Sequence, residues 1–122
     1  MVLVDIHGRL AITTLLYTLA LALWAWWRYF RKEGVSSSYW GALVINEILF
    51  IAQGVVGAIL YLNHLRPLGQ GMHVLYGVIG LLGIPAMFLF TRGSEARRAM
   101  LIYGAGLLFM VGIAIRAMMT GG

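Results

Sequence analysis

Apolar residues fill four long stretches of the chain, and short polar segments separate them. The apolar cores of these stretches run Leu10–Trp27, Tyr39–Leu62, Met72–Phe90 and Ala99–Met118. A helix needs about 20 mainly apolar residues to cross a bilayer. The pattern therefore predicts membrane helices over residues 8–28, 39–62, 72–91 and 98–118. Because these helices and short loops use nearly the whole chain, we expect an all-α, up-and-down four-helix bundle forming one transmembrane domain over residues 1–122.

The first apolar stretch lies where a secretory signal peptide would lie, but it lacks the other features of one. Asp5 precedes it, no small-residue cleavage site follows it, and the basic residues Arg28, Arg31 and Lys32 close it. A signal peptide has its positive charge before the apolar region and small residues after it. We therefore expect this stretch to remain in the protein as a helix.

The basic residues predict the orientation in the membrane. Of the nine lysines and arginines, six lie at the two connections that follow the first and third stretches: Arg28, Arg31, Lys32, Arg92, Arg97 and Arg98. Short cytoplasmic loops carry an excess of positive charge. We therefore expect a multi-pass protein of the cell inner (plasma) membrane, with both termini on the outer (periplasmic) side.

Composition agrees with a membrane location. Hydrophobic residues make up 61% of the chain and charged residues only 11%, which is too apolar for a soluble domain of this size. The net charge of +5 lies at the ends of apolar stretches, where it meets lipid head groups. The expected partners are therefore the lipid bilayer and other membrane subunits or a second copy, and not nucleic acid.

Two histidines occupy matching places, His7 at the head of the first stretch and His73 at the head of the third. The same number of residues separates His7 from Arg31 and His73 from Arg97. In an up-and-down bundle, the first and third helices run parallel and lie diagonally across the core. Imidazole is a common axial ligand of haem iron, and bundle cores are common places for such sites. The sequence thus predicts one haem b held by His7 and His73 near the outer surface.

Other residues at the same end are candidates for contacts with the haem. Arg9, Arg66 and Arg116 could pair with its propionates, and Gly77 and Gly80 leave room below His73 for a flat group. These residues also have structural explanations that need no haem. Small residues let membrane helices pack closely, and an arginine near a helix end reaches the lipid head groups. His64 is an alternative ligand, or a solvated histidine of the loop.

Glu47 is the second unusual residue, because it lies inside the predicted helix 39–62. An ionised carboxylate is costly at that depth. Glu47 could relay protons, contact a quinone or couple transport, or it could bond to a neighbouring helix or subunit.

Motifs for other chemistry are absent from the sequence. Without cysteine there is no disulfide, thiolate metal site or thiol nucleophile. No motif for phosphate binding, zinc hydrolysis or a Ser-His-Asp site occurs, so we assign no catalytic residue.

The layout resembles small four-helix membrane b-type cytochromes, the cytochrome b561-like group and the four-helix halves of haem A synthase. The shared features are four spans, His7 and His73 near helix ends on one side, and arginines at that edge. The resemblance implies electron exchange with a quinol or a redox partner, by a chain acting alone or as a small subunit of a respiratory or photosynthetic complex. The cytoplasmic side offers no histidines for a second haem. The alternatives are a small proton-coupled transporter using Glu47 and a cofactor-free structural subunit.

Overall fold

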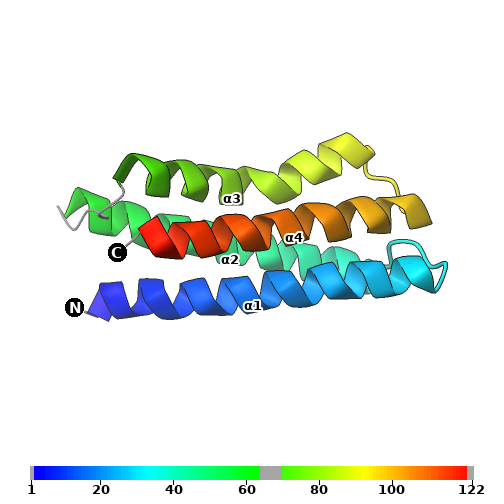
Figure 1. Cartoon of the computed structure of the whole chain (residues 1–122), viewed down its shortest axis with the longest axis horizontal. Helices are drawn as coiled ribbons and strands as arrows, with labels where there is room; N and C mark the ends of the chain where they lie inside the picture. Colours follow the sequence, from blue (N-terminus) through cyan, green and yellow to red (C-terminus); the bar gives the residue numbers. More distant parts are fainter. Residues whose placement is uncertain (1, 64–69, 121–122) are drawn as a thin grey trace.

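Four α-helices account for nearly all of the structure. The computed structural model describes residues 2–63 and 70–120, which form α1 (Val2–Phe30), α2 (Ser37–Leu62), α3 (Gln70–Thr91) and α4 (Arg97–Thr120) (Figure 1). The last three helices begin and end within about two residues of the predicted ranges. α1 begins at Val2, earlier than the predicted residue 8, because the polar residues near its start are compatible with a first helical turn. His7 therefore lies within α1 and not before it.

All four helices are long and apolar enough to cross a membrane. Large hydrophobic side chains are exposed on each of them, including Leu16 on α1, Val44 on α2, Leu82 on α3 and Phe109 on α4. Soluble proteins rarely expose so much apolar surface, because its contact with water is unfavourable. The fold is that of a multi-pass membrane protein.

The helices form two hairpins, α1–α2 and α3–α4, whose connections lie at the same end of the bundle (Figure 1). Around the bundle each helix packs on the next in the order α1, α2, α3, α4 and back to α1. Among the described residues the backbones of α1 and α3 do not meet, so these two helices lie diagonally opposite each other. This arrangement brings the heads of α1 and α3 to one end, which we call the histidine end. The opposite end, with residues 31–36 and 92–96, is called the loop end.

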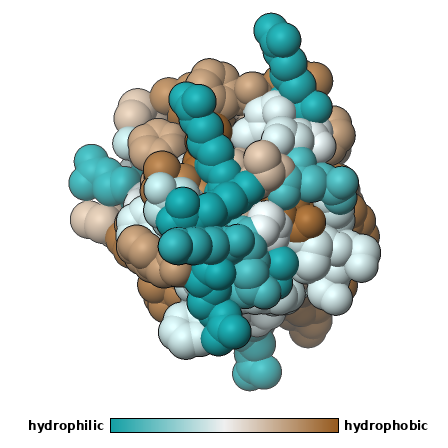
Figure 2. Space-filling view, turned by 90° about the vertical axis from the view of Figure 1, so that its right-hand side faces the viewer, coloured by the Kyte–Doolittle hydropathy of each residue, from teal (hydrophilic) through white to brown (hydrophobic). Residues whose placement is uncertain are grey.

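Hydrogen bonds tie the two connections together at the loop end. The backbone N–H of Val35 donates to the carbonyl of Glu95 at 2.9 Å, and Trp40 Nε1 donates to Glu95 Oε2 at 3.2 Å. Arg97 Nε donates to the carbonyl of Tyr29 at 2.7 Å, and its guanidinium lies over the Tyr29 ring. Figure 2 shows this end, where hydrophilic side chains project from a face surrounded by hydrophobic sides. The loop end is therefore both the polar and the rigidly connected end of the bundle.

Most of the buried core lies in the half of the bundle near the loop end. Leu21, Ala25, Tyr39, Met100 and Leu107 are among its members. α1 and α4 approach most closely here, because Gly104 presents its bare backbone to the indole ring of Trp26. Small residues allow this kind of close contact between membrane helices.

The half near the histidine end is packed differently. Residues 2–13 of α1, 71–79 of α3 and 112–120 of α4 contain no buried residue. The loop-end half therefore holds the helices together, and α1, α3 and α4 are less buried near the histidine end.

The close contact of α1 and α4 is tested by adding one methyl group at two glycines of α4. Gly104→Ala should destabilise the protein by about 1–3 kcal/mol, because the new Cβ would overlap the Trp26 ring. Gly112→Ala should be neutral, because nothing lies within 4 Å of the Cβ that it adds. Unfolding in mixed micelles measures both; equal stability of the two variants would contradict this packing.

Candidate functional site

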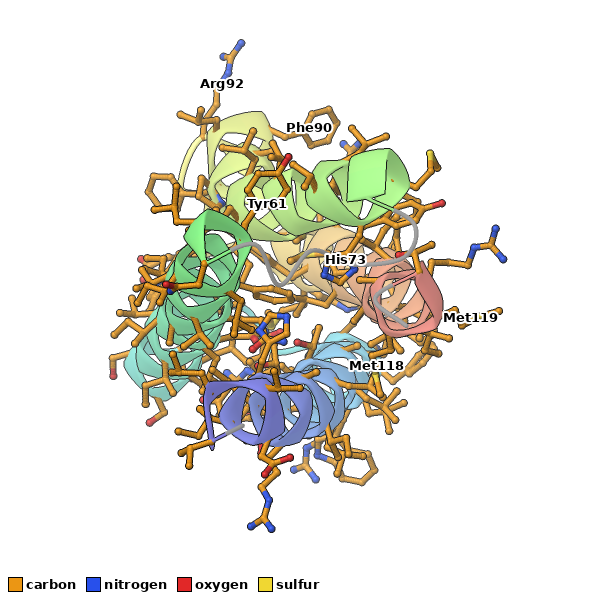
Figure 3. The ribbon with its side chains drawn as sticks, turned by 90° about the vertical axis from the view of Figure 1, so that its left-hand side faces the viewer. Tyr61, His73, Phe90, Arg92, Met118 and Met119 are labelled. Atoms are coloured by element: carbon orange, nitrogen blue, oxygen red, sulfur yellow. The ribbon has the colours of Figure 1, made fainter. Side chains whose placement is uncertain are left out.

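The two histidines predicted as a pair meet inside the bundle at the histidine end. The imidazole centroids of His7 and His73 are 6.1 Å apart, and the ring planes are inclined by 67°. Viewed from this end, His73 points into the space enclosed by the four helices (Figure 3). Because the backbones of α1 and α3 do not meet, these side chains bridge the diagonal of the bundle.

The last turn of α4 orients His73. His73 Nδ1 lies 2.8 Å from the carbonyl oxygen of Ala117 and 3.3 Å from Thr120 Oγ1. The Ala117 carbonyl also accepts a hydrogen bond from Thr120 Oγ1 at 3.2 Å. A carbonyl oxygen can only accept, so Nδ1 carries the proton. Nε2 of a neutral His73 is then a bare acceptor that can bind a metal.

α2 holds His7 from the side. A Cβ built on Gly57 would lie 3.3 Å from Cε1 of His7, so this glycine lets the ring rest close to the α2 backbone. Gln53, one turn earlier, donates from Nε2 to the carbonyl oxygen of His7 at 3.1 Å. Nδ1 of His7 and Oε1 of Gln53 are both buried and have no hydrogen-bond partner among the described residues.

Two imidazoles alone are too few for an isolated metal ion, which usually takes four or more ligands. In residues 2–63 and 70–120 no three histidine or acidic side chains gather into a metal-binding group. Haem needs only two further ligands, because its macrocycle supplies the other four. A metal–imidazole bond is about 2 Å long, so the centroids of two rings on opposite sides of one metal lie about 6 Å apart. The 6.1 Å separation of His7 and His73 fits such a pair.

The glycines below His73 differ in the space around them. A Cβ on Gly77 would meet nothing within 4 Å, although Gly77 shares the inward side of α3 with His73. Gly80 is buried, and the Phe50 ring lies 3.0 Å from its ideal Cβ position. Gly77 is exposed, whereas Phe50 fills the position beside Gly80. This is compatible with a flat group lying near the end of the bundle.

Of the predicted arginines, the structure describes Arg9 and Arg116. The side chains of Arg9 and Arg116 are exposed. By helical rotation, Arg9 lies on the side of α1 opposite His7, and Arg116 lies opposite the buried Leu107 of α4. Arg66 and the alternative ligand His64 lie outside the described residues. The pairing of arginines with propionates stays a prediction.

A line of polar side chains continues from His7 along the contact between α1 and α2. Thr14 and Thr18 follow His7 on one face of α1, and Asn46 shares a face of α2 with Gln53. Thr18 Oγ1 lies 2.7 Å from the carbonyl of Thr14 and 3.0 Å from Oδ1 of Asn46, and both Thr18 and Asn46 are fully buried. The hydroxyl carries one proton, so it donates either to Thr14 or to Asn46. The contact between Thr18 and Asn46 sets the register of α1 against α2 and so the height of His7 beside Gly57.

Glu47 lies apart from the histidine pair. It precedes Gly57 by ten residues, which is about 15 Å along α2. It lines a groove of 440 Å³ between α2 and α3, together with Trp40, Ile84, Pro85 and other side chains. Its Oε1 is buried and has no hydrogen-bond partner in the described part of the chain.

Two partners of the histidines were not assigned from the sequence. Ala117 acts through its backbone carbonyl, and side-chain chemistry carries no sign of that. The spacing of Gln53 does give a sign. Asn46 and Gln53 lie two turns apart on one face of α2, and His7 and Thr14 lie two turns apart on one face of α1, so two polar faces of equal spacing can meet.

Comparisons of the chain with models of protein families, with curated proteins and with solved structures found no match. The resemblance to small membrane cytochromes therefore rests on the layout and on His7 and His73.

The polar contact between α1 and α2 is tested by two matched threonines. Thr18→Val should destabilise the protein by about 1–2 kcal/mol, because it removes the bond to the buried Asn46. Thr13→Val should cost less than about 0.5 kcal/mol, because Thr13 bonds only to Arg9 of its own helix at an exposed position. The free energy of unfolding of both variants is measured in mixed micelles. Equal stability of the two variants would contradict the contact between Thr18 and Asn46.

Proposed function

We propose that this protein is a membrane electron-transfer protein that binds one b-type haem between α1 and α3 at the histidine end. The observation that carries the proposal is the meeting of His7 and His73 across the bundle, with centroids 6.1 Å apart. The protonated Nδ1 of His73 adds support, because a metal-bound histidine usually donates its second ring nitrogen to a carbonyl or carboxylate.

The chain's own residues would hold and orient the group. His7 and His73 would be its two axial ligands, and the Ala117 carbonyl would keep His73 in the metal-binding tautomer. The haem supplies one-electron redox chemistry when bound.

The orientation is part of the proposal. The loop end carries Arg28, Arg31 and Arg97 with the other basic residues of the connections, and the positive-inside rule puts such an end in the cytoplasm. The haem would then lie near the outer surface of the plasma membrane. A redox partner on that side, or a quinol in the bilayer, would exchange electrons with it.

The absorption spectrum of the purified protein tests the haem. Expressed with haem available, the protein should show Soret and α bands and contain one haem per chain. His7→Ala and His73→Ala should each abolish or shift these bands, because each removes one axial ligand.

His64→Ala is the matched control, because His64 is the remaining histidine. It should leave the bands unchanged. A folded, colourless protein that takes up no added haem would rule the proposal out, and loss of the bands in His64→Ala but not in His7→Ala would transfer the ligand role to His64.

A second candidate function is proton-coupled transport by Glu47. It is supported by the buried, unpartnered Oε1 of this residue beside the groove between α2 and α3. If it holds, uptake in vesicles should survive His7→Ala and be lost in Glu47→Gln, because only Glu47 would exchange the coupled proton. Glu33→Gln is the control, since Glu33 lies in a connection and pairs with Arg31. Uptake that persists in Glu47→Gln would exclude this function.

A further inference from the structure

We propose that Gln53 is the positioning residue of His7: its Oε1 accepts the Nδ1–H of His7 and so presents Nε2 to the metal. This inference rests on the proposed haem function, but it concerns a contact within the chain that can be measured without haem.

The first observation is that Gln53 is already attached to His7. Its Nε2 donates to the backbone carbonyl of His7 at 3.1 Å. This bond assigns the amide nitrogen and oxygen of Gln53: the end that faces the carbonyl oxygen must be the NH₂ group, because Oε1 cannot donate and would be repelled. The amide oxygen of Gln53 is therefore held within a few ångströms of the same residue.

The second observation is a complementary pair of unpartnered atoms. Nδ1 of His7 and Oε1 of Gln53 are both buried, and neither has a hydrogen-bond partner among the described residues. A buried polar atom without a partner is costly. One atom is a potential donor and the other an acceptor, and the Gln53 side chain is already bonded to the backbone of His7. A hydrogen bond between the two atoms would satisfy both.

The third observation is the equivalent arrangement at His73. There the Nδ1–H donates to the carbonyl oxygen of Ala117 at 2.8 Å. With Gln53 in the same role, each imidazole would have a neutral carbonyl-type acceptor on Nδ1 and Nε2 free. Two ligands of one metal would then have matched basicity.

Gly57 limits what else His7 can do. The close approach of its backbone to Cε1 leaves little freedom for the ring on the α2 side. The ring is therefore held against α2, the helix that also carries Gln53.

The experiment uses two substitutions of opposite effect. Gln53→Met keeps the length of the side chain and removes its acceptor, and Gln53→Glu provides a stronger one. A stronger acceptor on Nδ1–H makes the imidazole more basic and favours ferric iron. The midpoint potential of the haem should therefore rise in Gln53→Met and fall in Gln53→Glu, and haem affinity should drop about 10–100-fold in Gln53→Met.

Asn63→Leu is the matched control, since it removes another amide, at the C-cap of α2, which bonds to the carbonyl of Ile59 in that helix. It should leave the midpoint potential unchanged. If Gln53 acted only by packing, neither substitution at Gln53 would move the potential, or both would move it in the same direction; either result would overturn the inference.

Nitrogen-15 NMR of the haem-free protein tests the bond independently. His7 should be found as the Nδ1–H tautomer with a slowly exchanging ring proton, and Gln53→Met should abolish that protection. If the His7 signal were the same in the haem-free wild type and in haem-free Gln53→Met, the inference would be contradicted, whether or not the wild-type protein can bind haem. If the protein binds no haem but Gln53→Met changes the tautomer of His7, the proposed function fails and the positioning role of Gln53 stands.

Discussion

Polar side chains buried between membrane helices must find their hydrogen-bond partners within the protein, because lipid offers none. In this bundle the rule explains the contact between α1 and α2. Thr18 bonds to Asn46, Tyr39 bonds to the carbonyl of Leu21, and Gln53 bonds to the carbonyl of His7. These bonds occur at successive heights and set the register of the two helices. The position of His7 beside Gly57, and so opposite His73, follows from that register.

The two halves of the bundle differ in how deeply their residues are buried. Near the loop end, Trp26 against Gly104 and the linked connections hold the helices in place. Near the histidine end, few residues are buried, and His7 and His73 bridge helices whose backbones do not meet. A site built on rigid helices, with space between them, can present two ligands to a flat group without a change in the fold.

The sequence predicted the helices, their order around the bundle and the common end of His7 and His73, because apolar length and parallel helices determine these features. It placed the start of α1 too late, since polar residues near the end of a membrane helix do not show where the helix begins. The carbonyl of Ala117 was out of reach of the sequence, because any residue in that turn presents the same backbone atom. The side chains of Arg9 and Arg116 are exposed, and their pairing with haem propionates stays a prediction.

The claim that His7 and His73 bind opposite faces of one haem iron is tested most directly by the spin state of the oxidised protein. Electron paramagnetic resonance of the ferric form distinguishes six-coordinate iron with two nitrogen ligands from iron with one ligand. We predict a low-spin signal of a bis-imidazole haem in the wild-type protein and a high-spin signal in His7→Ala and in His73→Ala. A high-spin wild-type signal, or a low-spin signal that survives both substitutions, would contradict the account.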